Sequence, residues 1–367
     1  MSDDAKQRKP RTLHVRRGVD GGHDGLPGSR SRGEAAGGAR RRVLSAGQYV
    51  DGVLAGDRVV LARAITLIES NAPAHQDLAQ EVLTALLPRR CASVRVGITG
   101  VPGAGKSTLI EDLGTRLRAR GHKVAVTAVD PSSTVTGGSV LGDKTRMEKL
   151  AADPGAFIRP SPAGGTLGGV ARKTRETIVL FEAAGYDVVL VETVGVGQSE
   201  VMVRSMADFF LLVLIAGAGD ELQGIKRGVV ELADAVVINK ADGTGVRAAQ
   251  RTRAEFERVL HYLRPATEGW TTRALTASAL AGHGVDEIWA MIGEFLTKAR
   301  AGGAFDRRRA DQERAWVRAL VEEGLRDRFR AHPQVAAARQ ELEDQVARGE
   351  LPATAAARRL LDLFGQG

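Results

Sequence analysis

"GVPGAGKST", residues 100–108, is the stretch that decides the fold of this chain. It follows the apolar run "VRVGIT" at 94–99 and leads into an amphipathic helical pattern that begins near Lys106. Its glycines allow the backbone to curl, so that successive N–H groups and the helix N-terminus face an anion. A glycine-rich turn at a helix start is the alternative, which this context disfavours. We therefore predict a phosphate-binding loop made of Gly100, Val101, Pro102, Gly103, Ala104, Gly105, Lys106, Ser107 and Thr108, with Lys106 on the β- and γ-phosphates and Ser107 on Mg²⁺.

Short apolar runs alternate with amphipathic helical stretches from residue 94 onward. The runs are rich in Val, Ile and Leu and lack polar alternation, which is typical of parallel strands buried on both faces. We predict an α/β fold of the P-loop NTPase type, a mostly parallel sheet covered by helices on both faces. The predicted strands are "VRVGIT" (94–99), "KVAVTAV" (123–129), "AFIRP" (156–160), "YDVVLVE" (186–192), "FFLLVLI" (209–215), "AVVIN" (235–239) and "RALTAS" (273–278).

Four regions are expected along the chain. Residues 1–42 form a basic tail that we expect to be disordered, and 43–90 form an N-terminal helical extension. In the extension, Ser45 is a plausible helix cap, apolar residues recur at helical spacing from Val50 to Ile68, Pro73 breaks the run, and a second helix at about 75–87 completes a hairpin. Residues 91–302 form the P-loop domain. Residues 303–367 are helical and highly charged, so we expect an arm that pairs with another subunit.

Composition and charge narrow the function classes. The chain has 367 residues, 43% of them hydrophobic, and no apolar run of the length a membrane span requires, so we expect a soluble protein without a membrane partner. The single cysteine, Cys91, suits the cytoplasm, and acidic residues interrupt the N-terminus where a mitochondrial presequence would have none. Residues 1–42 hold eleven Lys or Arg and five Asp or Glu, a charge of +6 out of a total of +8. The basicity belongs to the tail, so a nucleic-acid partner is disfavoured.

"NKAD" at 239–242 follows a predicted strand and indicates the base. Guanine presents N1–H and a 2-amino group on one edge, and the Asp242 carboxylate accepts from both, whereas adenine has no matching donors. Asn239 would bond the base and brace the phosphate loop, and the Lys240 stem would lie against the ring. The segment Ala277-Ser278-Ala279 fits the backbone that closes over the guanine O6. GTP and GDP are therefore the predicted ligands.

Three carboxylates lie where strands end or loops begin, which is where ligands bind in parallel sheets. They are Asp130, Asp143 and Glu192. We predict Ser107, Asp130, Asp143 and Glu192 as the Mg²⁺ site, and Lys106, Asp143 and Glu192 as the catalytic residues of GTP hydrolysis. A turn before Pro131 is the alternative role for Asp130. The stretches at 135–147, 193–200 and 216–228 look like switch loops, with Arg146, Lys226 and Arg227 as candidates to neutralise developing charge.

Six motifs in order resemble the MeaB-like GTPases, the family of the methylmalonic aciduria type A protein. They are "GVPGAGKSTLI", "DPSS", "GGSVLGDKTRM", "ETVGVGQSE", "GAGDELQGIKRG" and "NKADG", and the similarity runs from about residue 45 to beyond 330. Ala216 departs from the proline expected before "GAGDELQG". Such proteins have also been called lysine/arginine/ornithine transport ATPases, although the guanine-reading "NKAD" argues against an ATPase.

The resemblance implies a homodimeric GTPase chaperone of an adenosylcobalamin-dependent acyl-CoA mutase, typically methylmalonyl-CoA mutase. It implies that GTP binding and hydrolysis gate cofactor loading and protect the mutase, that the switches face the partner, and that the C-terminal helices make the dimer. Adenosylcobalamin is then held by the partner mutase, since no motif here identifies a cobalamin-binding residue.

Two other functions stay open at this stage. A nickel-inserting metallochaperone GTPase shares the phosphate loop, but this chain offers one cysteine and no His-rich tract for a soft metal. An RNA- or ribosome-associated GTPase has the basic tail as its only support, and deletion of residues 1–42 tests it.

Overall fold

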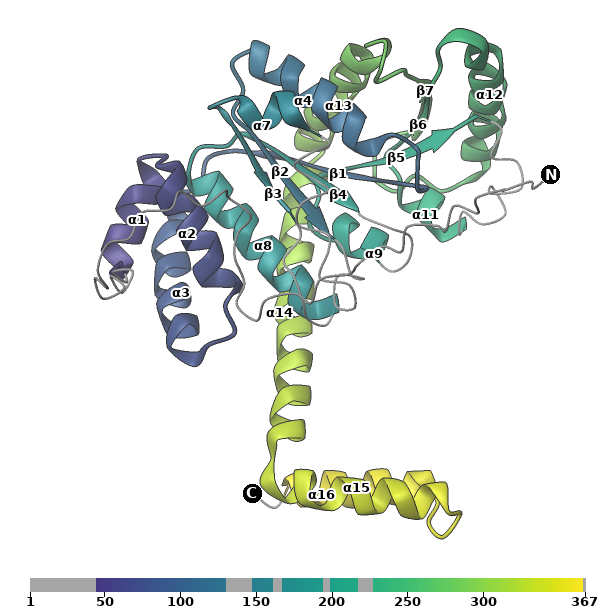
Figure 1. Cartoon of the computed structure of the whole chain (residues 1–367). Coiled ribbons are helices and arrows are strands. Elements are labelled where there is room, and N and C mark those ends of the chain that lie inside the picture. The colour runs from purple at the N-terminus through teal and green to yellow at the C-terminus, as the bar shows by residue number, and fades with distance from the viewer. Residues whose placement is uncertain (1–43, 130–146, 161–166, 194–198, 217–226, 366–367) are drawn as a thin grey trace, which may run out of the picture. The chain divides into compact units, whose positions relative to one another are not determined.

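The computed structural model describes residues 44–129, 147–160, 167–193, 199–216 and 227–365. Seven strands form one sheet in the order β3-β2-β4-β1-β5-β6-β7, and all neighbours are parallel (Figure 1). The predicted fold class is confirmed, and each predicted strand lies within two residues of its observed bounds. The strands are β1 (Val94–Gly100), β2 (Val124–Val129), β3 (Ala156–Arg159), β4 (Val188–Thr193), β5 (Phe209–Ile215), β6 (Ala235–Asn239) and β7 (Arg273–Thr276).

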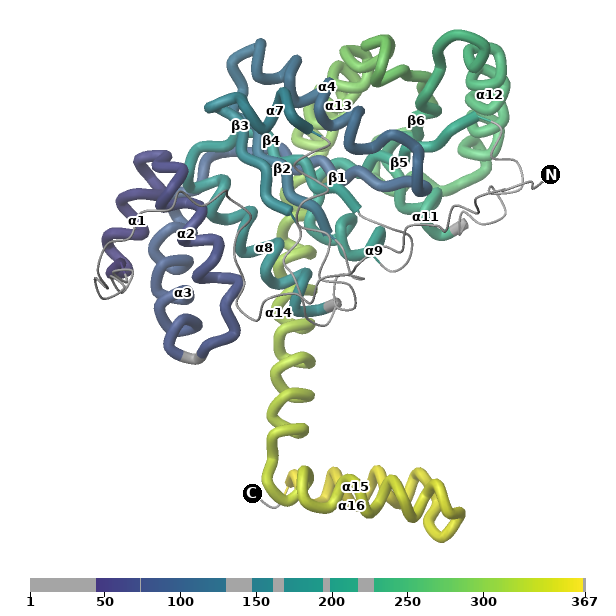
Figure 2. Tube along the Cα trace, in the orientation of Figure 1, coloured from purple at the N-terminus to yellow at the C-terminus, as the bar shows by residue number. Residues whose placement is uncertain are grey.

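Alternate residues of the strands enter different cores, which explains why the strands show no polar alternation. In β5, Phe209 and Leu211 belong to the core on one face, whereas Phe210 and Leu212 are buried on the other. The first face is covered by α4 (Lys106–Ala119), α7 (Glu148–Ala152) and α13 (Val285–Ala301). The opposite face is covered by α8 (Leu167–Ala183), α9 (Ser199–Arg204), α11 (Arg227–Leu232) and α12 (Val246–Tyr262), as the traces in Figures 1 and 2 show.

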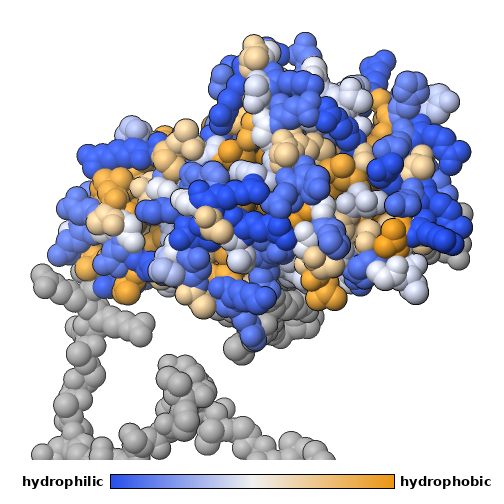
Figure 3. All heavy atoms as spheres, turned by 90° about the horizontal axis from the view of Figure 1, so that it is seen from above, coloured by the Kyte–Doolittle hydropathy of each residue, from blue (hydrophilic) through white to orange (hydrophobic). Residues whose placement is uncertain are grey.

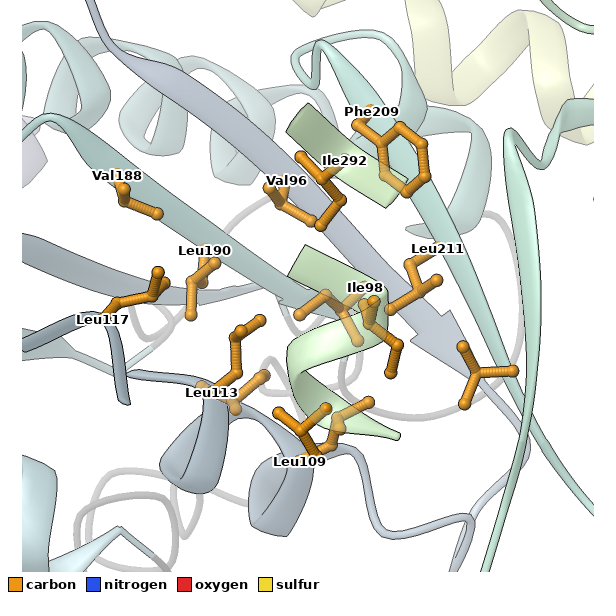
Figure 4. Close-up of a cluster of buried hydrophobic side chains, with 14 of the residues drawn as sticks. Val96, Ile98, Leu109, Leu113, Leu117, Val188, Leu190, Phe209, Leu211 and Ile292 are labelled. Atoms are coloured by element: carbon orange, nitrogen blue, oxygen red, sulfur yellow. The ribbon is translucent and has the colours of Figure 1, made fainter. Parts of the chain in front are cut away.

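Helix α4 is anchored on the sheet by a stripe of leucines. Leu109, Leu113 and Leu117 recur every four residues and point toward Val96 and Ile98 of β1 and Leu190 of β4 (Figure 4). All three leucines are at most 1% exposed, so each contributes on the order of 2 kcal/mol of hydrophobic stabilisation. Seen from above, the surface of the molecule is mostly hydrophilic, with hydrophobic patches between the hydrophilic side chains (Figure 3).

The N-terminal extension contains one more helix than the predicted hairpin. The apolar run expected to form a single helix is divided into α1 (Ala46–Leu54) and α2 (Arg58–Glu69), which precede α3 (Pro73–Leu86). Gly56 adopts φ 72° after α1, and the Asp57 carboxylate accepts from the N–H groups at 59 and 60 to cap α2. A glycine followed by a capping residue was the local signal for this break. The Ser45 cap is confirmed, as part of a capping box with Gln48.

The C-terminal region is helical, as predicted, and consists of α14 (Ala304–Ala331), α15 (Pro333–Ala347) and α16 (Ala353–Gly365). Its first turns are held at the amino ends of the strands by buried charges. Arg309 donates to the fully buried Asp208 carboxylate from Nε at 2.8 Å and from Nη2 at 2.7 Å, and Arg308 contacts Asp234. Gln312 donates to the Ala207 carbonyl at 2.9 Å. Farther along α14, Val317, Val321 and Leu325 form a stripe that is more than half exposed.

Candidate nucleotide-binding site

The phosphate loop connects the central strand β1 to helix α4. The loop leaves β1 at Gly100 and reaches the helix through Gly105, which adopts φ 82°. A Cβ at position 105 would lie 2.8 Å from Asn239 Nδ2, so this position requires glycine for both its conformation and its contact. Helix α4 begins directly after this glycine, and the N–H groups at the N-terminus of a helix favour an anion.

Lys106 and Ser107 stand on the first turn of α4. The buried Lys106 ammonium donates to the carbonyls of Gly100 at 2.9 Å and Val101 at 3.3 Å, so its charge lies inside the loop. The Ser107 hydroxyl donates to Glu192 Oε1 at 2.9 Å. These two contacts place a cation and a hydroxyl–carboxylate pair side by side at one end of the helix.

Glu192 reaches this position because β4 is the neighbour of β1. The parallel register pairs Glu192 with Ile98, near the carboxyl end of both strands, and the side chain is 4% exposed. Thr99 and Thr193 on the same strands share a hydrogen bond of 2.9 Å. A buried carboxylate beside a hydroxyl is an oxygen donor set of the kind that Mg²⁺ prefers.

The second half of the site surrounds the predicted base. Asn239, at the end of β6, donates to the Ala104 carbonyl at 2.8 Å and accepts from the Ala279 N–H at 3.2 Å. It thus ties the phosphate loop to the segment after β7. Lys240 follows in a left-handed conformation, φ 59°, which is uncommon for a residue with a side chain. Asp242 accepts a short hydrogen bond from the Ser278 hydroxyl.

These groups line one pocket. It is lined by Gly105, Thr108, Asn239, Lys240, Asp242, Ser278, Ala279 and Leu280. All of these residues except Leu280 were predicted from the sequence. Leu280 directly follows the predicted segment 277–279, and this position was the one indication that it belongs to the pocket. Its side chain is 88% exposed, which leaves an apolar surface at the rim of the pocket. Ala277, the remaining member of the segment, is buried and donates to the Ile238 carbonyl at 2.9 Å.

Some predicted residues lie outside the described ranges. Asp130, Asp143, Arg146 and Lys226 are among them, as are most of the three predicted switch loops. Arg227 is the first residue of α11, and its side chain is not described. Three residues of the second predicted switch are described: Thr193, which ends β4, and Ser199 and Glu200, which begin helix α9, and all three are buried.

Within the described ranges, no three His, Cys, Asp or Glu side chains lie close enough together to hold a metal ion. In the same part of the chain, no helix has both the length and the apolar character needed to cross a bilayer.

Comparisons with known proteins agree on one family. The family model described as "Methylmalonyl Co-A mutase-associated GTPase MeaB" matches residues 61–334. A Caulobacter vibrioides protein named as a GTPase is 56% identical over 313 residues, which cover 85% of this chain and 96% of that protein. The mouse methylmalonic aciduria type A homolog, which is mitochondrial, is 45% identical over 323 residues and matches across 85% of this chain and 78% of its own length.

A solved structure supports the same conclusion. The crystal structure of a LAO/AO transport system kinase superposes with a TM-score of 0.71 at 39% sequence identity, covering 88% of this chain and 98% of that chain. The family model, the sequence identities and the structural superposition thus agree. The chain belongs to the MeaB family of P-loop GTPases.

Proposed function

We propose that this GTPase gates the loading of adenosylcobalamin into an acyl-CoA mutase, methylmalonyl-CoA mutase in the first instance, and protects that mutase from inactivation. The family model is named for association with methylmalonyl-CoA mutase, and the mouse relative is named for methylmalonic aciduria. Adenosylcobalamin is bound by the mutase, and this chain supplies the nucleotide-dependent step.

The nucleotide roles follow from the two ends of the pocket. Residues 100–108 hold the phosphates, with Lys106 exchanging its carbonyl partners for phosphate oxygens. At the other end, Asp242 accepts from guanine N1–H and the 2-amino group, Asn239 and the 277–279 backbone bond the base, and Lys240 lies against the ring. The observation that carries the nucleotide assignment is the Asn239 bridge, because it joins the phosphate end and the base end in one site.

A Mg²⁺ ion fits the hydroxyl–carboxylate pair at the start of α4. Ser107 and Glu192 would hold it, together with Asp130 and Asp143 from outside the described residues. When bound, the ion neutralises charge on the transferring phosphoryl group. Glu192 and Asp143 then orient the attacking water. We expect slow intrinsic hydrolysis, since the phosphate loop contains no arginine.

The contacts of α9 suggest how the nucleotide state reaches the rest of the molecule. This helix begins six residues after β4 ends at Thr193, and its last residue, Arg204, lies 3.8 Å from Asp234. Gln312 of α14 donates to the Arg204 carbonyl at 3.3 Å. A shift of α9 on loss of the γ-phosphate would therefore be transmitted to the arm.

The proposal also includes a homodimer and the four regions predicted from the sequence, which are 1–42, 43–90, 91–302 and 303–367. The exposed stripe of Val317, Val321 and Leu325 on α14 is an apolar surface of the kind that subunits bury against each other. We place the protein in the cytoplasm.

The test is a binding experiment with purified full-length protein and a methylmalonyl-CoA mutase. We expect a complex on size-exclusion chromatography whose amount differs severalfold between a non-hydrolysable GTP analogue and GDP, and transfer of adenosylcobalamin that depends on the nucleotide. Asp242→Asn should lose the response to the GTP analogue and recover it with the xanthosine analogue, because xanthine offers a carbonyl where guanine has an amino group. An absent complex, or one indifferent to the nucleotide, contradicts the proposal.

A further inference from the structure

The segment that follows β7 is a closed loop. Ser278 and His283 exchange backbone hydrogen bonds of 2.9 and 3.1 Å, and the Ser278 hydroxyl accepts from the Ala281 N–H at 3.1 Å. We call residues 278–283 the base loop, since Ser278, Ala279 and Leu280 line the pocket. The loop therefore sets the position of three of the eight residues that line the pocket.

Two glycines allow the base loop to change conformation unless another part of the protein holds it. Gly282 lies inside it at φ 71°, and Gly284 at φ 77° connects it to α13. Glycine reaches several backbone regions at low cost, so two glycines so close together permit the loop to shift. A shift of about 1 Å at Ala279 would break its 3.2 Å bond to Asn239.

Arg116 supplies that contact from the phosphate-loop helix. Its Nη2 donates to the Gly282 carbonyl at 2.9 Å, and its Nη1 donates to Asp286 at 2.6 Å in the first turn of α13. Its Nε donates to Asp112 at 3.1 Å, one turn earlier on α4. One guanidinium thus joins the loop, the helix after the loop and the helix that begins at Lys106.

The helix that carries Arg116 is a rigid support. The leucine stripe of α4 packs on the sheet, and Ile292 of α13 lies in the same core (Figure 4). Ile288 of α13 belongs to this core too, and both isoleucines are fully buried. Arg116 is ten residues from Lys106, about 15 Å along the helix. The distance between the phosphate end and the base loop is therefore determined by one packed helix.

We propose that Arg116 is a positioning residue for base recognition, which holds the base loop at a fixed separation from the phosphate loop and so contributes to the preference for guanine nucleotides. The inference rests on the proposed nucleotide site but not on the mutase partner. Since Arg116 is 31% exposed and its partner Asp286 is 47% exposed, the effect of its loss is moderate.

The test uses the full-length protein and calorimetric titration with GDP, ADP and inorganic pyrophosphate. Arg116→Met keeps most of the aliphatic stem and removes the guanidinium. We expect GDP affinity to fall about fivefold to tenfold while ADP and pyrophosphate affinities stay within about twofold, so that the selectivity for guanine falls. Arg116→Lys retains one donor for the Gly282 carbonyl and should recover part of the loss.

Arg120→Met is the matched control. Arg120 is the C-cap residue of α4, one turn after Arg116, and binds the same Asp286 at 2.5 Å, so this variant removes a neighbouring charge and ion pair without removing the loop contact. It should bind GDP as the unmodified protein does. Equal losses for GDP and pyrophosphate in Arg116→Met, unchanged GDP affinity, or the same loss in Arg120→Met would each overturn the assignment. If the unmodified protein does not prefer GDP to ADP, the nucleotide site itself fails, which is a separate result.

Discussion

The two edges of the sheet use buried charge in different ways. At the amino ends, Arg309 and Asp208 bind each other with two hydrogen bonds, and Arg95 binds Glu182 in the same manner at 2.7 and 2.9 Å. At the carboxyl ends, Lys106 bonds to backbone carbonyls and Asp242 bonds to a hydroxyl.

This difference distinguishes charges that stabilise the fold from charges that bind a ligand. A charge that is paired with an opposite charge is satisfied permanently, and its role is to hold α14 and the strands together. The Asp242 carboxylate is bonded to the neutral Ser278 hydroxyl and retains most of its field, so that a guanine edge can replace the hydroxyl at little cost. Changes at the amino ends should therefore affect stability, and changes at the carboxyl ends should affect ligand affinity.

The largest expected effect is at the amino ends. Asp208→Asn leaves Arg309 without its charge partner and weakens a bond to the Arg95 N–H, so the free energy of unfolding should fall by about 3 kcal/mol. Urea denaturation measures it, and GTP affinity of the folded protein should not change. Asp311→Asn is the control on α14, because its ion pair with Arg314 is exposed and should contribute nothing measurable. Similar effects of both variants would contradict the comparison.

Lys106→Ala should produce the largest loss of binding. Removal of the ammonium eliminates the charge that faces the phosphates, and we expect GTP affinity to fall at least about 100-fold, with hydrolysis lost. Calorimetry measures the affinity and phosphate release measures turnover. Lys123→Ala, an exposed lysine at the amino end of β2, should leave both unchanged. If Lys106→Ala retained its affinity for GTP, the prediction that Lys106 binds the phosphates would be wrong.

Asp242→Asn should change the choice of base more than the total affinity. The amide cannot accept both guanine donors, so GTP affinity should fall about 10-fold to 100-fold while affinity for xanthosine triphosphate rises. Competition between the two nucleotides measures the ratio. An unchanged preference for GTP would show that another group reads the base.

The smallest expected effect is a dependence of stability on pH. Burial raises the pKa of Glu176 on α8 to about 7, against the lowering influence of Arg172 and Lys173. The folded state then holds a proton that the unfolded state releases above about pH 4.5, so this contribution to stability is full below pH 4.5 and is lost as the pH rises through 7. Glu176→Gln should be more stable than the unmodified protein at pH 8, by about 1–2 kcal/mol, and the difference should vanish near pH 4.5. If the difference in unfolding free energy between the two proteins did not depend on pH, the raised pKa of Glu176 would be contradicted.

Local patterns predicted most of the residues that line the candidate nucleotide pocket, because they are concentrated in short segments. The phosphate loop, "NKAD" and residues 277–279 each lie at the end of a strand, and a parallel sheet brings such ends together. Leu280 was missed because an apolar residue after a strand has no distinctive chemistry. Arg116 was missed because its partners, Gly282 and Asp286, are more than 160 residues away in the sequence.

The sequence alone determined the fold class, the positions of the strands, the Ser45 cap and the family, because these depend on local spacing and on contiguous motifs. Only the tertiary structure decided the strand order, which places Glu192 beside Ser107, the bridge of Asn239 to Ala104 and Ala279, and the pairing of Arg309 with Asp208. The physical reason is that hydrogen bonds and ion pairs act over about 3 Å. Their partners are therefore selected by the packing of helices on the sheet, which no local pattern encodes.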